Sequence, residues 1–178
     1  MQQFGFGQPA DGIIQMAYVV ENIDDAIAWW IGELKVGPWF LARDFAGLNQ
    51  QYRGAPALGK TSNALSFAGH MMIELIQPED DHPSVFHEVI NSRGYGFHHF
   101  GKGCADTDAT VASMVAQGYQ VAFRAGVPTG GEVVHLDRPG QPGFVELIPA
   151  IPQTDAFFTS LWQASLNWDG SDPVRALG

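Results

Sequence analysis

Short apolar runs and stretches of helical spacing alternate along the chain, and one succession of them occurs twice. Residues 15–28 and 99–112 each hold a strand-like run, then an Asn/Asp-x-Asp stretch, then apolar residues at helical spacing. Asn and Asp side chains accept hydrogen bonds from the free N–H groups at a helix start, so these stretches predict helix N-termini. We therefore expect helices at about 24–34 and 108–117.

Each copy closes with nearly the same strand, Ile-Glu-Leu-Ile at 73–76 and Val-Glu-Leu-Ile at 145–148, with a proline soon after. Gly and Pro bound further short runs of strand-forming residues between helix and closing strand. These runs are Trp39–Arg43, Ala64–Ala68, Gln120–Ala125 and Glu132–Leu136. Each copy therefore has the order strand, helix, strand, strand, strand.

Two further helices are expected outside the repeats. Residues 83–93 have helical spacing and stop at a glycine, which suits a connecting helix, and 154–168 form an amphipathic C-terminal helix. The polar tail beyond Asp169 is expected to be loose. We predict an α+β fold with two tandem βαβββ modules at about 13–78 and 97–150.

Length and composition fit one soluble domain over residues 1–178. The sequence is 46% hydrophobic and only 16% charged, which favours a packed core over disorder. Nine basic against 19 acidic residues give a net charge of −10, and that charge repels nucleic-acid phosphates and anionic lipid surfaces. We therefore expect neither a nucleic-acid nor a membrane partner.

The cysteine content and the absence of long apolar runs bear on location. Cys104 has no partner thiol for a disulfide or a thiolate zinc site. No apolar run approaches the ~18 residues of a membrane span, and the first residues show no signal-peptide pattern. We expect a cytoplasmic protein.

Four polar residues occupy equivalent strand positions in the two copies: Gln15 with His99, and Glu74 with Glu146. A glutamate in a strand commonly points to solvent from one polar face. Here the pairing between copies favours another interpretation, in which the four side chains converge on one cleft. Buried carboxylates are tolerated when they coordinate a metal ion.

As a donor set the four side chains suit one divalent metal ion. Two carboxylates, an imidazole and an amide oxygen offer mixed O/N ligation for Zn, Ni, Co, Mn or Fe. The set has no thiolate and leaves positions for water or substrate, which is typical of catalytic rather than structural zinc sites. Strand alternation predicts that His99 faces this site and that His98 points away.

The duplicated modules, the ligand-bearing first strands, the Glu-Leu-Ile closing strands and the segment Gly-Phe-His-His at 96–99 resemble the vicinal oxygen chelate superfamily of glyoxalases and bleomycin-resistance proteins. The resemblance covers about residues 13–150. It implies a curved mixed sheet around a metal-binding cleft, with Gln15, Glu74, His99 and Glu146 as ligands. It also implies bidentate chelation of substrate oxygens and stabilisation of an enolate or enediolate, with Glu146 or Glu74 moving the proton.

Within the superfamily the sequence resembles two branches. The order of the four candidate ligands along the chain is similar to the Gln, Glu, His, Glu of zinc-type glyoxalase I, but the positive residues with which that enzyme holds glutathione are missing here. The linker 78–99 resembles methylmalonyl-CoA epimerase, from whose His, Gln, His, Glu pattern Gln15 and Glu74 depart. In the epimerase branch a further acid, from the middle of the first module, serves as the base. Asp44 is the only acid near that position in this sequence. Ring-cleaving dioxygenases and fosfomycin-type thiol transferases need a His where Gln15 stands.

Substrate contacts are inferred from aromatic residues expected to border the cleft: Trp39, Phe40, Tyr52 and Phe123. Arg43, Arg53 and Arg124 are candidates for anchoring a carboxylate or CoA phosphate, although a solvated position is the more common one for any single arginine. The other histidines have no repeat partner, and we expect each to be on the surface or locally satisfied: His70, His82, His87 and His135.

Two functions remain open at this point. One is a metal-dependent lyase, isomerase or epimerase acting beside a carbonyl group. The other is a protein of the same fold that sequesters an apolar small molecule without turnover.

The apolar stretch 157–168 must be buried, either against its own sheet or against a second subunit, and we expect a homodimer.

Overall fold

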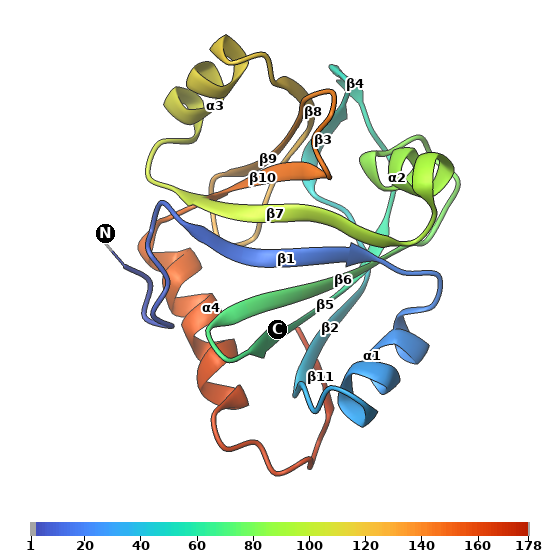
Figure 1. Cartoon of the computed structure of the whole chain (residues 1–178), viewed down its shortest axis with the longest axis vertical. Helices are drawn as coiled ribbons and strands as arrows, with labels where there is room; N and C mark the ends of the chain where they lie inside the picture. Colours follow the sequence, from blue (N-terminus) through green and yellow to red (C-terminus); the bar gives the residue numbers. More distant parts are fainter. Residues whose placement is uncertain (1–2, 178) are drawn as a thin grey trace.

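The computed structural model describes residues 3–177, and within them eleven strands form one mixed sheet accompanied by four helices (Figure 1). The strands are β1 (Ile13–Val19), β2 (Trp39–Phe45), β3 (Leu48–Tyr52), β4 (Ala55–Pro56), β5 (Thr61–Ala68), β6 (Met71–Pro78), β7 (Gly96–Cys104), β8 (Gln120–Gly126), β9 (Glu132–Asp137), β10 (Phe144–Pro149) and β11 (Val174–Ala176). The helices are α1 (Ile23–Gly32), α2 (Val85–Arg93), α3 (Thr107–Ala116) and α4 (Pro152–Ser165). The predicted α+β fold with a mixed sheet is confirmed.

The sheet contains the same strand order twice. One half runs β1-β6-β5-β2 and the other β7-β10-β9-β8, with β1 and β7 antiparallel to each other at the centre. In both halves the helix leads to a strand two places beyond the closing strand, and two antiparallel pairings bring the closing strand back parallel to the first strand. The two halves are therefore βαβββ units related across the β1–β7 pair.

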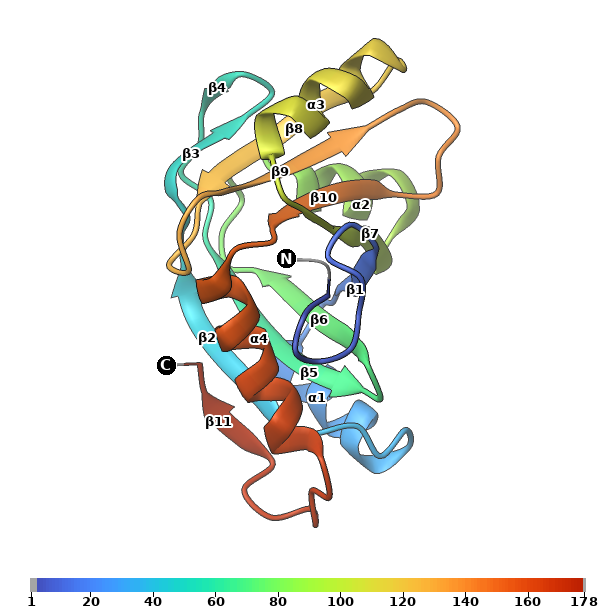
Figure 2. The same cartoon turned by 90° about the vertical axis from the view of Figure 1, so that its left-hand side faces the viewer.

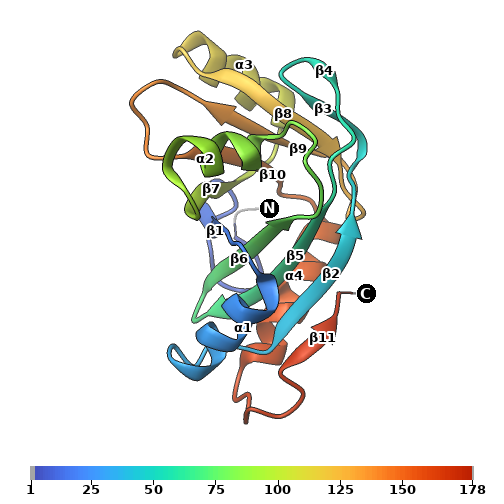
Figure 3. The ribbon, with the colours of Figure 1, turned by 90° about the vertical axis from the view of Figure 1, so that its right-hand side faces the viewer.

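The sheet curls because of a short connection between its two sides. Strands β2 and β3 are separated in the chain by Ala46 and Gly47 alone, yet β2 pairs with β5 in the first half and β3 pairs with β8 in the second. Figure 3 shows β2 continuing into β3 along one side of the molecule. A Cβ atom on Gly47 would lie 2.5 Å from the Cβ of Ala125, so the crossing needs a glycine. The sheet is drawn into a cradle without closing as a barrel.

Helices α1 and α3 begin where their caps predict. Asn22 accepts hydrogen bonds from the N–H groups of Asp24 and Asp25, and Asp106 accepts one from Ala109. Ile23 and Ile27 of α1 pack into a core cluster on one face of the first half. Helix α4 covers the other face of that half, as Figures 2 and 3 show from opposite sides.

The C-terminal region differs from expectation. Residues beyond Asp169 are not loose: β11 pairs in parallel with β2, with Val174 opposite Trp39. Helix α4 buries Phe158 and Leu161 against its own sheet, together with the N-terminal Phe6. The apolar face that motivated a dimer is therefore covered within the chain, and the homodimer stays a prediction.

A charged network links the two halves on the outside of the cradle. Arg53, after β3, donates to Glu88 of α2 and to Asp137 of β9, with the shortest N–O distances 2.7 and 2.8 Å. Burial raises the pKa of Glu88, but hydrogen bonds from Arg53 and Tyr52 outweigh it and lower that pKa overall. Ionised Glu88 is therefore stabilised by folding.

We expect Arg53→Gln to lower the free energy of unfolding by about 1 kcal/mol or less at neutral pH, since the network is partly exposed and screened by solvent. A group with a lowered folded-state pKa stabilises the fold above its ordinary pKa and loses that effect as the pH falls through the lowered value. The difference between wild type and variant should shrink in acid. Urea unfolding at several pH values measures it, with Arg43→Gln, at a more exposed pair with Asp24, as the control.

Candidate functional site

The strand register at the centre of the sheet places Gln15 and Glu146 on either side of a glycine. Gln15 of β1 is opposite Gly101 of β7, and Gly101 is opposite Glu146 of β10. A Cβ atom on Gly101 would lie 2.5 Å from Oε1 and 2.7 Å from Cβ of Gln15. The side chain of Gln15 therefore occupies the space that a residue other than glycine would fill.

The neighbouring row of the sheet repeats this arrangement with Glu74 and His99. Ala17 of β1 lies between Glu74 of β6 and His99 of β7 in the register. Residues two apart in a strand share a face, so Gln15 and His99 point to the same side of the sheet. The small Ala17 and Gly101 leave room for the four longer side chains to meet.

The four side chains predicted from the repeat are within contact of one another. His99 Nε2 lies 3.3 Å from Gln15 Oε1, 3.2 Å from Glu146 Oε2 and 3.5 Å from Glu74 Oε2. The Nε2 amide of Gln15 donates to Glu74 Oε2 at 3.1 Å. Four potential ligand side chains thus converge on one small region. Glu74, His99 and Glu146 each offer one ligand atom, and these three atoms lie within 4.8 Å of one another.

The buried acids of this cluster favour the binding of a cation. Burial raises the pKa of Glu74 well above its ordinary value, helped by the charge of Glu146, and burial raises the pKa of Glu146 to about 8. Burial also lowers the pKa of His99 to about 3, so the imidazole is neutral and does not offset the acids. Two buried carboxyl groups without a basic partner, beside a neutral imidazole and an amide oxygen, fit a divalent metal ion.

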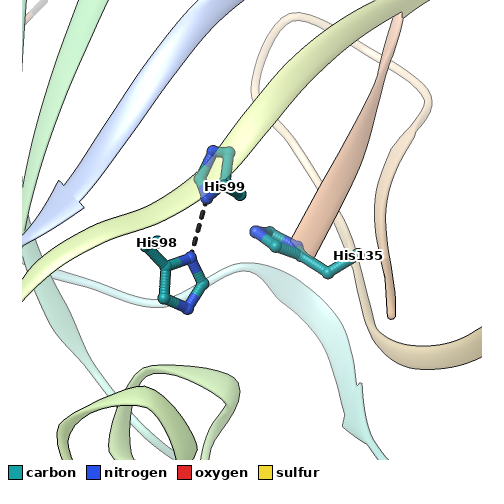
Figure 4. Close-up of side chains that lie close together, drawn as sticks. All are labelled: His98, His99 and His135. Atoms are coloured by element: carbon teal, nitrogen blue, oxygen red, sulfur yellow. Dashed lines mark hydrogen bonds between the residues drawn. The ribbon is translucent and has the colours of Figure 1, made fainter. Parts of the chain in front are cut away.

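His98 sets the orientation of the His99 ring (Figure 4). His98 is fully buried; its Nε2 lies 3.2 Å from the carbonyl oxygen of Val85, and its Nδ1 lies 2.8 Å from Nδ1 of His99. Burial lowers the pKa of both rings, so each carries one N–H. Both contacts are satisfied when His98 Nε2 donates to Val85 and His99 Nδ1 donates to His98. The lone pair of His99 Nε2 then faces the carboxyl groups.

His135 contradicts the expectation of a surface or locally satisfied histidine. It is only 3% exposed and lies close to His98 and His99 (Figure 4). Neither ring nitrogen has a hydrogen-bond partner among the described residues, and Nε2 is 3.9 Å from Glu146 Oε1. The repeat could not reveal it, because its register counterpart is Leu65. Pairing the expected strands at 132–136 and 145–148 would have predicted the position of His135, because it lies directly opposite Glu146 in the β9–β10 pair.

The cluster lies in the wall of a cavity of about 550 Å³, which both halves of the sheet and the C-terminal helix line. Its walls are mostly apolar and include five phenylalanines: Phe45, Phe86, Phe123, Phe157 and Phe158. The sequence pattern did not indicate that α4 or Leu177 would border the site. Two other hollows, one beside β5 and one near Trp168, are lined by none of the predicted ligands.

Of the four aromatic residues predicted to contact substrate, one lines the cavity, one borders an adjoining hollow, and two do not reach the cavity. Phe123 lines the cavity, while Tyr52 donates to Glu88 and borders a small adjoining hollow. Trp39 does not reach the cavity: it is fully buried on the α1 side of the sheet, with its indole N–H donating to the carbonyl oxygen of Val36. Phe40 lies against the α4 core cluster under Arg175 and is absent from the cavity wall.

The charged candidates for substrate anchoring are engaged outside the cavity. Arg43 pairs with Asp24, Arg53 with Glu88 and Asp137, and Arg124 with Glu132. Asp44 is exposed, and it does not line the cavity.

Among the described residues, no helix is both long and apolar enough to cross a membrane.

Comparison with known proteins agrees with the geometry. The sequence model of the family described as "Glyoxalase/Bleomycin resistance protein/Dioxygenase superfamily" matches residues 14–135, a range that includes Gln15, Glu74 and His99 but not Glu146. No curated protein matches the sequence.

Three solved structures illustrate the fold similarity. A hypothetical protein of Bacillus halodurans C-125 is 20% identical, with a TM-score of 0.60 over 77% of this chain and 92% of its own. Methylmalonyl-CoA epimerase of Mycobacterium tuberculosis is 18% identical, with a TM-score of 0.54 over 82% and 91%. A mutant of 4-hydroxymandelate synthase from Streptomyces coelicolor is 14% identical, with a TM-score of 0.59 over 79% of this chain and 39% of its own.

We expect Gly101→Ala to displace Gln15 and to weaken binding of Zn²⁺ or Mn²⁺ by about tenfold or more, since losing one ligand contact costs at least ~1.4 kcal/mol. Calorimetric titration of chelator-treated protein measures the affinity. Gly32→Ala is the matched control, because a Cβ there meets no atom within 4 Å. Equal metal affinity in the two variants would contradict the role assigned to Gln15.

Proposed function

The chain belongs to the glyoxalase/bleomycin resistance protein/dioxygenase superfamily, and from this premise we propose that it is a metal-dependent lyase, isomerase or epimerase. It would move a proton at a carbon beside a carbonyl group of a small substrate. One observation carries the proposal: two buried acids, a neutral imidazole and an amide oxygen meet in the wall of an otherwise apolar cavity. Such a set is costly to bury unless it binds a cation.

Gln15, Glu74, His99 and Glu146 would hold one divalent ion, for which Zn, Ni, Co and Mn are the candidates. When bound, the ion would polarise a carbonyl group and stabilise the negative charge that develops on its oxygen. The His98–His99 hydrogen bond holds the Nε2 lone pair of His99 toward this position. These residues therefore supply the ligands and their orientation.

Glu146 is the better of the two candidates for the proton-transfer base. Glu74 Oε2 is held by the amide of Gln15 at 3.1 Å, whereas Glu146 Oε1 has no hydrogen bond from a described residue. A carboxylate that is free to turn can take a proton from a substrate carbon and return one to it.

The apolar walls would keep water from the reacting carbon. Phe86, Phe123 and Phe158 border the cavity together with aliphatic side chains. Electrostatic interactions strengthen where water is excluded, so a proton transfer between Glu146 and a substrate would be favoured there. The methylmalonyl-CoA epimerase and 4-hydroxymandelate synthase structures share this fold, which supports an enzyme but does not choose the reaction.

Sequestration of an apolar ligand is the second candidate function. The mostly apolar walls of the cavity favour it, since such walls bind without needing chemistry. The acid cluster favours catalysis, because retention of an apolar molecule gains nothing from two buried carboxyl groups. A homodimer and a cytoplasmic location remain part of the proposal.

We expect metal-loaded protein in D₂O to exchange the α-proton of at least one compound in a panel of hydroxyketones, α-ketoacids and acyl-CoA thioesters. Glu146→Gln should slow that exchange by about 100-fold or more, because general acid–base catalysis contributes 10²–10⁴-fold. Glu21→Gln, which changes an exposed acid, is the control and should leave the rate unchanged. NMR follows the exchange, and elemental analysis gives the metal content.

Chelation of the metal should also stop the exchange, and adding the ion back should restore it. Stoichiometric binding of an apolar compound with no exchange in the metal-loaded protein would support sequestration instead. Exchange that survives both chelation and Glu146→Gln would refute the proposed roles of the cluster.

A further inference from the structure

The cavity contains no group that would attract an anionic substrate. None of the nine Lys and Arg residues, all within residues 3–177, belongs to its lining. The charged side chains that do line it are the two acids Glu74 and Glu146. A divalent ion bound between them would bring their combined charge to about zero and would leave no surplus positive charge for a phosphate or a distant carboxylate.

The basic residues nearest to the cavity are held by other partners. Arg124 lies on β8, whose Phe123 and Ala125 line the cavity, yet its guanidinium pairs outward with Glu132 at 2.9 Å. Arg53 is held by Glu88 and Asp137. Drawing either arginine inward would break these pairs.

Lys60 is the basic residue that borders the small adjoining hollow beside β5. That hollow offers only about 20 Å³, which is room for about one water molecule. Asp80 borders the same hollow and accepts a hydrogen bond from the backbone N–H of Lys60. The hollow therefore has no room for the arm of a nucleotide thioester.

His135 gives the cavity a polar feature besides the acid cluster. Its imidazole is buried, and both ring nitrogens lack a partner among the described residues. A buried polar group left unpaired costs about 1–3 kcal/mol, so a ligand that hydrogen-bonds to it gains affinity by removing that cost. The register counterpart in the first half, Leu65, lines the cavity as an apolar residue. At this register position, beside the acid of each closing strand, the second half thus offers a hydrogen bond and the first half does not; the unpartnered Oδ1 of Asn63 lines the cavity at another position of β5.

We propose that this cavity takes an uncharged, largely apolar carbonyl compound with a neighbouring hydroxyl group, not an anionic conjugate such as a CoA thioester, and that His135 hydrogen-bonds the hydroxyl group. The proposal rests on the proposed function for the acid cluster as the place of the carbonyl group. A volume of about 550 Å³ is in the range of sites for small organic ligands.

Four compounds test the charge requirement. The first is α-hydroxyacetophenone, which is uncharged. The second is its derivative with a carboxylate at ring position 4, which keeps the hydroxyketone and adds a distant charge. Acetophenone, which lacks the hydroxyl group, and methylmalonyl-CoA complete the set. Isothermal titration calorimetry on the full-length protein, metal-loaded and metal-free, gives the affinities without depending on turnover.

We expect the ring carboxylate to weaken binding by about tenfold or more, because a charge desolvated against apolar walls without a cation is costly. Methylmalonyl-CoA should bind more weakly than α-hydroxyacetophenone in both forms of the protein. Equal or tighter binding of the carboxylate derivative or of methylmalonyl-CoA would overturn the proposal, as would failure of both uncharged ketones to bind up to their solubility limits.

Substitution of His135 tests the hydrogen bond. His135→Leu copies the residue of the other half and should weaken α-hydroxyacetophenone by about tenfold while changing acetophenone by no more than about twofold. Binding of acetophenone also shows that the variant is folded. His135→Gln, which keeps hydrogen-bonding atoms, should recover part of the loss. Equal weakening of both ketones would show a structural role only and would overturn the assignment of His135.

The two proposals fail separately. If no compound exchanges its α-proton but the order of affinities holds, the proposed enzymatic function is wrong and the substrate class stands. If exchange occurs with an anionic thioester that also binds best, the enzymatic function stands and the inferred substrate class is wrong.

Discussion

The antiparallel pairing of β1 with β7 is the constraint on which the rest of this structure depends. It joins the two halves at their equivalent strands, so that Gln15 and His99 become diagonal neighbours at the centre of the sheet. The closing strand of each half then lies immediately outside, which brings Glu74 and Glu146 to the two flanks. A shift of this pairing by one residue would turn one half's ligands to the opposite face.

The fold and the four central residues could be predicted because they are encoded locally and twice. Helix caps, strand-forming runs and two nearly identical closing strands are each visible in a short window of sequence, and the repeat aligned Gln15 with His99 and Glu74 with Glu146. Other features depend on contacts between distant segments. The return of β11 to β2, the placement of α4 over the cavity and the burial of His135 follow from how the sheet curls. Trp39 was misplaced although its strand begins where expected, because contacts between distant segments, here with α1, decide which face of β2 carries the core.

Curling the sheet also makes the two halves unequal. Strand β3 has no counterpart in the second half, because it leaves the first half and pairs with β8. This crossing brings β3 beside Phe123 and α2, whereas β11 extends the edge of the first half and α4 covers one of its faces. Duplication therefore supplies symmetric ligands, and the connections outside the repeat supply an asymmetric cavity. A pocket between unequal walls can hold an asymmetric substrate in one orientation.

The connecting helix has a part in the site that its position outside the two modules does not suggest. Val85 is the first residue of α2, and its carbonyl oxygen lies 3.2 Å from Nε2 of His98. That contact fixes which nitrogen of His98 carries the proton, and His98 in turn fixes the tautomer of His99. Without it, His99 could place its proton on Nε2 and offer no lone pair to the carboxyl groups. The register of two strands thus determines where His99 lies, and the start of α2 determines what its ring can bind.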